Sequence, residues 1–138
     1  MMMQGREQHF ITGNSFPMGL ICRGVRIFPE TLENYRLALT QGTWSSFWGH
    51  PNTLTAAAQQ CGFDLTPRTE RPVLTVDAEG YPMLNNERFA ECWVLTPEYK
   101  PGFRPALQSE VPADQITGWK VLHMIWDTAA ASKDEPDE

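Results

Sequence analysis

TWSSFWGHPNTLTAAAQQCG, residues 43–62, places a short aromatic segment directly before a helical one. In an extended chain Trp44, Ser46 and Trp48 would share one face and Ser45 and Phe47 the other, which indicates a strand buried on at least one face. The apolar residues that follow recur at the spacing of one helix face (Leu54, Ala57, Ala58 and Cys61), and Gly62 supplies a helix stop. A strand over 43–48 and a helix over about 51–61 therefore form a predicted β–α unit.

The rest of the chain extends this pattern. Pro29 is followed by an amphipathic segment that predicts a helix over 30–41, with the proline at its first turn. A proline-rich loop over 97–112 leads to a short helical turn near 113–117. Runs of apolar and β-branched residues predict further strands over 8–12, 24–28, 71–77, 88–96 and 119–127. We expect one small α/β or α+β domain over residues 1–126, with a single mixed sheet flanked by helices.

Composition and charge narrow the class of protein. Of the 138 residues, 41% are hydrophobic and 20% charged, which indicates a folded domain rather than a disordered chain. No apolar run is long enough to span a membrane, and the first residues lack the apolar centre of a signal peptide, so we expect a cytoplasmic protein without a membrane partner. Three widely spaced cysteines, Cys22, Cys61 and Cys92, are interpreted as reduced, packed thiols.

The negative charge is concentrated at the C-terminus. The whole chain has a net charge of −6, and residues 127–138 carry five acids against one lysine, a net of −4. We expect this segment to be a disordered acidic tail. The remaining net of −2 argues against a binder of duplex nucleic acid, which gains affinity from a basic face. It leaves room for a local arginine-lined anion pocket.

His50 raises the question of function, because it stands between the predicted strand and helix. A helix N-terminus attracts phosphate through its free N–H groups and its partial positive charge. The same field lowers the pKa of a nearby imidazole, whereas a bound phosphate raises it, and this combination suits general acid–base work on a phosphodiester. Thr53 is a candidate donor to the same anion. The simpler interpretation is a surface histidine at the start of a helix.

Other motifs add little. His9, His50 and His123 share no metal-ligand spacing, and no phosphate-loop, nucleophile-elbow or zinc-protease motif is present, so we expect no metal and no cofactor. Arg68, Arg71 and Arg104 lie in proline-rich stretches, where they are candidates for a bidentate phosphate clamp or are simply solvated.

The order of these segments resembles a known family. FITGNSFPMGL, then a strand and a helix, then SFWGHPNTLTAAAQQCG and ERPVLTV, is similar to the viral ring nucleases, small proteins of archaeal viruses and phages. The resemblance covers roughly residues 8–126 and is most specific in the opening stretch and the Gly-His helix. It implies a homodimer that binds cyclic tetra-adenylate, a messenger of type III CRISPR immunity. It also implies metal-free cleavage, in which a ribose 2′-hydroxyl attacks the adjacent phosphorus.

The family's residues map unevenly onto this chain. Gly49 and His50 match the Gly-His pair, Thr53 the threonine that follows, and Asn14 the opening asparagine if Gly13 is an insertion. The resemblance makes His50 the catalytic residue and assigns substrate binding to Asn14, Ser15, Gly49, Thr53, Arg71 and Arg104.

Three departures stand out. Pro17 falls where the family has a ligand-contacting serine, with Ser15 nearby, and Glu70 falls where an asparagine precedes the arginine. The family's second arginine is missing from EYKPGFRP, where Arg104 or Lys100 is a candidate substitute. The segment 77–87 reads as an insertion.

The leading hypothesis is a metal-independent ring nuclease, or at least a binder, of a small cyclic oligoadenylate, which would counter nucleotide-signalled antiviral immunity. The alternative is a non-catalytic ligand sponge or protein-interaction module of phage or mobile-element origin on the same fold, favoured by the missing arginine and serine. A third interpretation is a structural virion or housekeeping protein.

A cyclic ligand has rotational symmetry, and an efficient pocket for it lies on a protein two-fold axis. We therefore expect a C2 homodimer in which His50 of both chains lines one shared, positively biased cavity, with the loop PEYKPGFRP closing over it.

Overall fold

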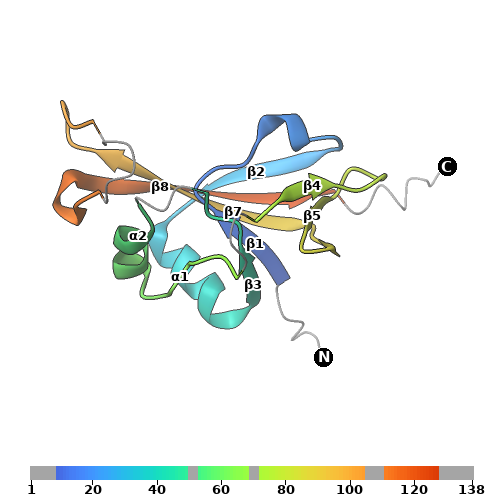
Figure 1. Cartoon of the computed structure of the whole chain (residues 1–138), viewed down its shortest axis with the longest axis horizontal. Coiled ribbons are helices and arrows are strands. Elements are labelled where there is room, and N and C mark those ends of the chain that lie inside the picture. Colours follow the sequence, from blue (N-terminus) through green and yellow to red (C-terminus); the bar gives the residue numbers. More distant parts are fainter. Residues whose placement is uncertain (1–8, 50–52, 69–71, 105–110, 128–138) are drawn as a thin grey trace.

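The computed structural model describes residues 9–49, 53–68, 72–104 and 111–127 (Figure 1). Its large sheet has the order β2-β8-β7-β1-β3, in which β1 runs parallel to β3 and β7, while β8 runs antiparallel to β2 and β7. The expected mixed sheet of an α+β domain is confirmed. Its strands are β1 (His9–Gly13), β2 (Val25–Glu30), β3 (Thr43–Ser46), β7 (Glu91–Tyr99) and β8 (Ile116–Trp126).

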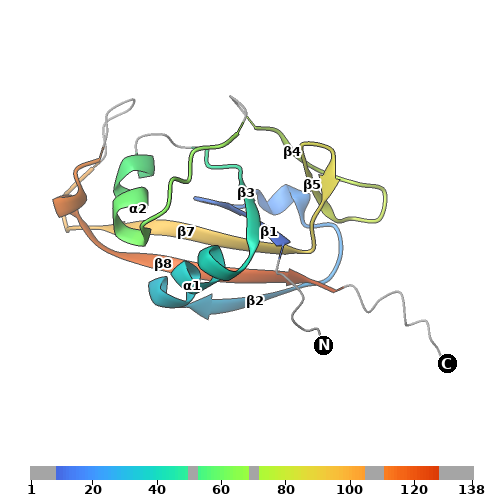
Figure 2. The same cartoon turned by 90° about the horizontal axis from the view of Figure 1, so that it is seen from below.

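Two helices, α1 (Leu32–Gln41) and α2 (Leu54–Cys61), cover one face of this sheet (Figures 1 and 2). Because side chains alternate along a strand, every second residue of β1, β7 and β8 points to the helices. The core on this side contains Phe10, Tyr35, Leu39, Trp48, Ala57, Cys61, Leu65, Trp93, Leu95 and Val121. Within it, Thr12 Oγ1 and the Tyr35 hydroxyl form a hydrogen bond of 2.7 Å, and burial raises the pKa of Tyr35.

Both helices begin later than the sequence suggests. Pro29 and Glu30 belong to β2, and α1 starts at Leu32 behind Thr31, whose side chain accepts a hydrogen bond of 3.1 Å from the Asn34 N–H. Pro29 extends the strand and does not begin the helix, because it pairs with β8. β2 is an edge strand, and an edge strand tolerates a residue without an N–H. The second helix is predicted from about residue 51 but starts at Leu54. Its N-cap is Thr53, which is three residues after His50 in sequence.

A second sheet covers the opposite face and was not foreseen. It has three antiparallel strands, β4 (Leu74–Val76), β5 (Pro82–Leu84) and β6 (Glu87–Arg88), so the segment 77–87 contains β5 and the start of β6. Asn85 and Asn86 both have positive φ, at 54° and 66°, and form the two-residue turn between β5 and β6. The buried side chains of this second sheet pack in a second core with Ile11, Phe47, Cys92, Val94, Met124 and Trp126.

A cluster of charged residues surrounds Tyr81 and links the second sheet to the large one. The buried Tyr81 ring lies between two guanidinium groups, with Arg23 at 4.1 Å and Arg88 at 4.6 Å from its centroid. Arg88 donates to Asp77 and Glu79 at 2.6 Å each, while Arg23 donates to the backbone oxygens of Glu79 and Asp127. Residues from both ends of the chain therefore hold the 77–81 turn against the large sheet.

The long pair β7–β8 lies inside the large sheet, between β2 and β1. Its register runs from Glu91 opposite Ile125 to Tyr99 opposite Ile116, with an irregularity at Glu98 and Tyr99. The short helical turn expected here is a 3-10 turn, Ala113–Gln115. Asp127 is both the last residue of the predicted strand 119–127 and the first of the predicted tail, and its N–H donates to the Gly24 oxygen at 3.0 Å. In the part of the chain that the structure describes, no helix is long and apolar enough to cross a membrane.

Candidate functional site

The candidate site lies where three parallel strands come together. The carboxyl ends of the parallel strands β1 and β3 lie side by side, next to the middle of β7. Open α/β sheets commonly bind ligands at the carboxyl ends of their strands. Asn14 directly follows β1, and Gly49 follows β3 by three residues. The topology thus brings the opening motif and the Gly-His motif to the same end of the sheet.

One hydrogen bond joins these two motifs. The Gly49 N–H donates to Asn14 Oδ1 at 2.9 Å, across 35 residues of sequence. The Asn14 backbone oxygen in turn accepts from the Thr96 hydroxyl of β7 at 3.0 Å. Asn14 is therefore held between β3 and β7, and no hydrogen bond occupies its side-chain amide N–H groups among the described residues. These N–H groups are donors suited to a phosphate or a base edge.

The two glycines at this end of the sheet, Gly13 and Gly49, differ in the space that surrounds them. A Cβ on Gly13 would lie 2.7 Å from the Phe47 ring, so the close packing of that ring requires glycine. A Cβ on Gly49 would meet only Asn14 Oδ1, at 3.8 Å, which is an ordinary contact. Packing within the described residues therefore does not explain Gly49, and the close approach of a ligand to its backbone is the interpretation that we test below.

The other predicted site residues do not gather around Asn14 and Gly49 in the part of the chain that the structure describes. His50 and Arg71 lie outside the described residues. Ser15 is exposed beside Asn14, and Arg104 is exposed in the loop after β7. Thr53 is buried, and its hydroxyl oxygen accepts from Trp48 Nε1 at 3.1 Å. That contact positions the start of α2 and turns the Thr53 side chain into the protein.

Sequence reasoning missed a histidine cluster at the other end of the same strands. His9 Nε2 and Glu87 Oε2 are 2.5 Å apart, and His9 Nδ1 and Thr43 Oγ1 are 2.7 Å apart. His9 also stacks on Phe89 with a centroid separation of 4.7 Å. Residues 9, 43 and 87 are too far apart in sequence to form a motif, so nothing could have signalled the cluster. It ties β6 to the starts of β1 and β3, remote from Asn14.

A second histidine contact is half-buried. His123 Nε2 lies 2.5 Å from Glu91 Oε2, and its ring stacks on Trp93 with centroids 4.1 Å apart. Both residues come from paired strands of the large sheet. Within the described ranges, no group of three or more His, Cys, Asp or Glu side chains is placed to hold a metal ion.

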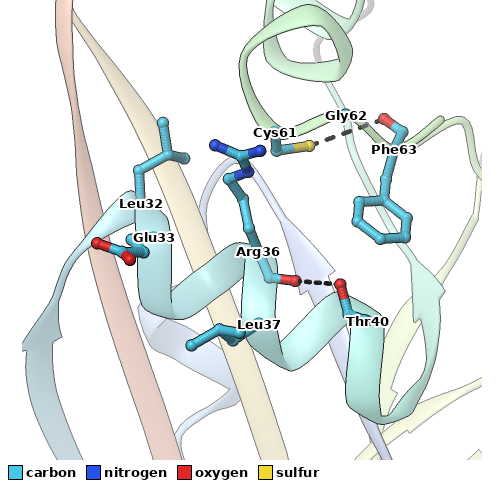
Figure 3. Close-up of a pocket in the computed structure, with 8 residues that line it drawn as sticks. All are labelled: Leu32, Glu33, Arg36, Leu37, Thr40, Cys61, Gly62 and Phe63. Carbon is cyan, nitrogen blue, oxygen red and sulfur yellow. Dashed lines mark hydrogen bonds between the residues drawn. The ribbon is translucent and has the colours of Figure 1, made fainter.

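Two surface grooves lie beside α1 and α2, and neither is lined by the predicted ligand residues. The first, of about 510 Å³, separates α1 from the end of α2 and is drawn in Figure 3. There Arg36 points toward Cys61, whose thiol donates to the Phe63 oxygen at 3.7 Å. The second groove, of about 560 Å³, lies between α2 and the loop 62–66.

Burial disfavours the thiolate form of two cysteines, Cys61 and Cys92. Burial raises the pKa of Cys61, against the lowering effect of backbone hydrogen bonds and Arg36. Burial, with a smaller effect of Glu91, raises the pKa of Cys92 well above its ordinary value. Both thiols are therefore protonated at neutral pH, whereas Cys22 is exposed.

No family model matches the chain, and the comparison with curated proteins finds no related sequence.

Proposed function

We propose that the chain binds a small cyclic oligoadenylate at the carboxyl ends of β1 and β3, and that it cleaves the ring without a metal ion. The observation that carries this proposal is the Asn14–Gly49 hydrogen bond of 2.9 Å. It unites two segments that the resemblance to viral ring nucleases assigns to one ligand site. Asn14 then plays two roles, because its oxygen fixes the backbone before His50 and its amide N–H groups face the ligand.

The chemistry that we propose is an internal transesterification. A ribose 2′-oxygen attacks the neighbouring phosphorus, the bond from phosphorus to the 5′-oxygen breaks, and a 2′,3′-cyclic phosphate forms. The 2′-hydroxyl proton passes to water, and His50 donates a proton to the leaving 5′-oxygen. Arg71 and Arg104 are the cations proposed to stabilise the charge that builds on the phosphate.

A second candidate is a non-catalytic sponge or interaction module on the same fold. The outer edge of β2, which presents apolar side chains to solvent, favours a protein-interaction role. Binding without turnover would identify the sponge, and the absence of any nucleotide effect would leave the interaction module.

The test is incubation with cyclic tetra-adenylate, with and without EDTA, followed by chromatographic separation of the products. We expect turnover in both conditions and its loss in His50→Ala, with ligand affinity retained. His9→Gln is the matched control, because His9 lies at the opposite end of β1 and should leave turnover unchanged. If the protein neither binds nor cleaves this ligand, the proposed function is wrong.

A further inference from the structure

The outer edge of β2 is an open strand edge. β2 is the last strand of the large sheet and pairs with β8 alone among the described strands. Asp127 N–H donates to the Gly24 oxygen, which fixes the phase of the ladder. In an antiparallel pair, residues alternate between bonding inward and facing outward. Arg26, Phe28 and Glu30 therefore bond to β8, while Val25, Ile27 and Pro29 direct their backbone groups outward.

This edge carries apolar side chains that the described parts of the chain leave exposed. Ile27 is 47% exposed and Phe28 is 40% exposed, and their side chains project from opposite faces of the strand. Pro29 removes one outward donor but keeps its carbonyl oxygen as an acceptor. The edge thus offers N–H donors at Val25 and Ile27 and an acceptor at each outward position.

The charges on this strand are arranged symmetrically. Arg26 and Glu30 stand two residues before and two residues after Phe28, on the same face of the sheet. Arg26 forms no ion pair with any described residue, and Glu30 accepts only an amide hydrogen bond from Asn34, at 2.9 Å. A strand of this pattern is complementary to itself when it is turned around Phe28.

We propose that β2 is the interface for a second copy of this chain, joined edge to edge and antiparallel on a two-fold axis through Phe28. In this register Phe28 faces Phe28 of the second copy, and Arg26 faces Glu30 of the second copy on both sides of the axis. Ile27 N–H donates to the Pro29 oxygen of the second copy, and the reverse bond follows by symmetry. The two large sheets, of five strands each, become one continuous sheet of ten strands.

This proposal is independent of the proposed ligand site. β2 and β3 form opposite edges of the large sheet, so pairing through β2 leaves the Asn14–Gly49 end of each subunit open. Failure of the ligand assay would not affect the interface, and failure of the interface would not affect the ligand assay.

Cysteine cross-linking tests the register, in a Cys22→Ser background that removes the exposed native thiol. Directly opposite residues outside the hydrogen-bonded pairs have Cα atoms about 4.5 Å apart, within the span of a disulfide. We therefore expect Phe28→Cys to form a covalent dimer that thiol reductant reverses. Ile27→Cys is the matched control, because its two copies would lie diagonally, at about 7–8 Å, too far apart to bridge.

Charge reversal tests the contact itself by light scattering over a concentration series. Arg26→Glu should raise the dimer dissociation constant by about tenfold or more, and Arg26→Glu combined with Glu30→Arg should restore it. Circular dichroism confirms that each variant is folded. A wild-type monomer at every concentration, cross-linking of Ile27→Cys as fast as Phe28→Cys, or a double variant that stays monomeric would each overturn the proposal.

Discussion

At the residue scale, Asn14 connects the sheet to the candidate site. Its side-chain oxygen accepts from Gly49 and its backbone oxygen accepts from Thr96. We expect Asn14→Ala to lower the free energy of unfolding by about 1 kcal/mol, because the hydrogen bond to Gly49 is lost. Asn14→Asp, which keeps an acceptor oxygen, should recover most of that loss. Urea unfolding measures both, and equal stability of wild type and Asn14→Ala would contradict the positioning role.

The two glycines of the site provide a paired prediction. Gly13→Ala places a methyl group 2.7 Å from the Phe47 ring and should cost about 1–3 kcal/mol, as overpacking does. Gly49→Ala meets only an ordinary contact and should change stability by less than about 0.5 kcal/mol. If Gly49→Ala retains its thermal midpoint but loses ligand affinity, close approach of the ligand explains the glycine. Similar losses of stability in both variants would contradict the packing argument.

Asp77 gives the stability of the fold a pH dependence. Partial burial raises the pKa of Asp77, but hydrogen bonds from the Tyr81 N–H, Arg88 and the Glu79 N–H outweigh it, and the net shift is downward. A carboxyl with a lowered pKa stabilises the fold above its unfolded pKa of about 3.9. That stabilisation disappears as the pH falls through the lower folded pKa.

The corresponding experiment compares wild type with Asp77→Asn by urea unfolding between neutral and acid pH. The difference in unfolding free energy should be largest near neutral pH and should shrink below about pH 5, roughly one unit above the unfolded pKa. A difference that stays constant down to about pH 2 would show that ionisation of Asp77 does not stabilise the 77–81 turn.

At the element scale, the small sheet depends on its tightest turn. Asn85 and Asn86 both adopt left-handed backbone conformations, which asparagine tolerates and most residues do not. We expect Asn86→Ala to lower stability by about 1 kcal/mol and Asn86→Gly to maintain or raise it, since Asn-Gly is the preferred pair in such turns. Differential scanning calorimetry of the two variants measures this, and an unchanged midpoint for Asn86→Ala would contradict it.

The sequence predicts the large elements well, for a simple reason. The body of α1 buries Tyr35, Ala38 and Leu39 at helical spacing, and β7 and β8 contain long runs of apolar and aromatic residues, and both signals are visible without coordinates. Element ends are predicted poorly. Pro29 suits the first turn of a helix and also the edge of a sheet, and only the pairing of β2 with β8 decides between them.

Other features depend on contacts that local sequence does not contain. The predicted strand 71–77 contains β4, but β5 and β6 are only three and two residues long, too short for a period to be recognised, and the Arg23–Tyr81–Arg88 stack beside them joins residues far apart in sequence. In the candidate site, Asn14 and Gly49 were identified from motif resemblance. Thr96 was not, because a hydroxyl 82 residues away that bonds to a backbone oxygen has no sequence signature.

At the scale of the whole molecule, the two edges of the large sheet offer different contacts. The cavity shared by two copies of His50, expected from the symmetry of a cyclic ligand, remains a prediction and requires a contact near the Gly49 end. The proposed β2 contact uses the opposite edge. If both contacts form, two distinct two-fold interfaces build an assembly larger than a dimer, and light scattering with and without ligand separates these cases.

Binding of a small cyclic oligoadenylate at the carboxyl ends of β1 and β3 is the central proposal. Isothermal titration with cyclic tetra-adenylate tests it most directly, using wild type, Asn14→Ala and His9→Gln. We predict saturable binding by wild type and His9→Gln, and an affinity at least about tenfold lower for Asn14→Ala, which loses both its amide donors and its hold on Gly49. Absence of heat for wild type, or equal affinity of wild type and a folded Asn14→Ala, would contradict the proposal.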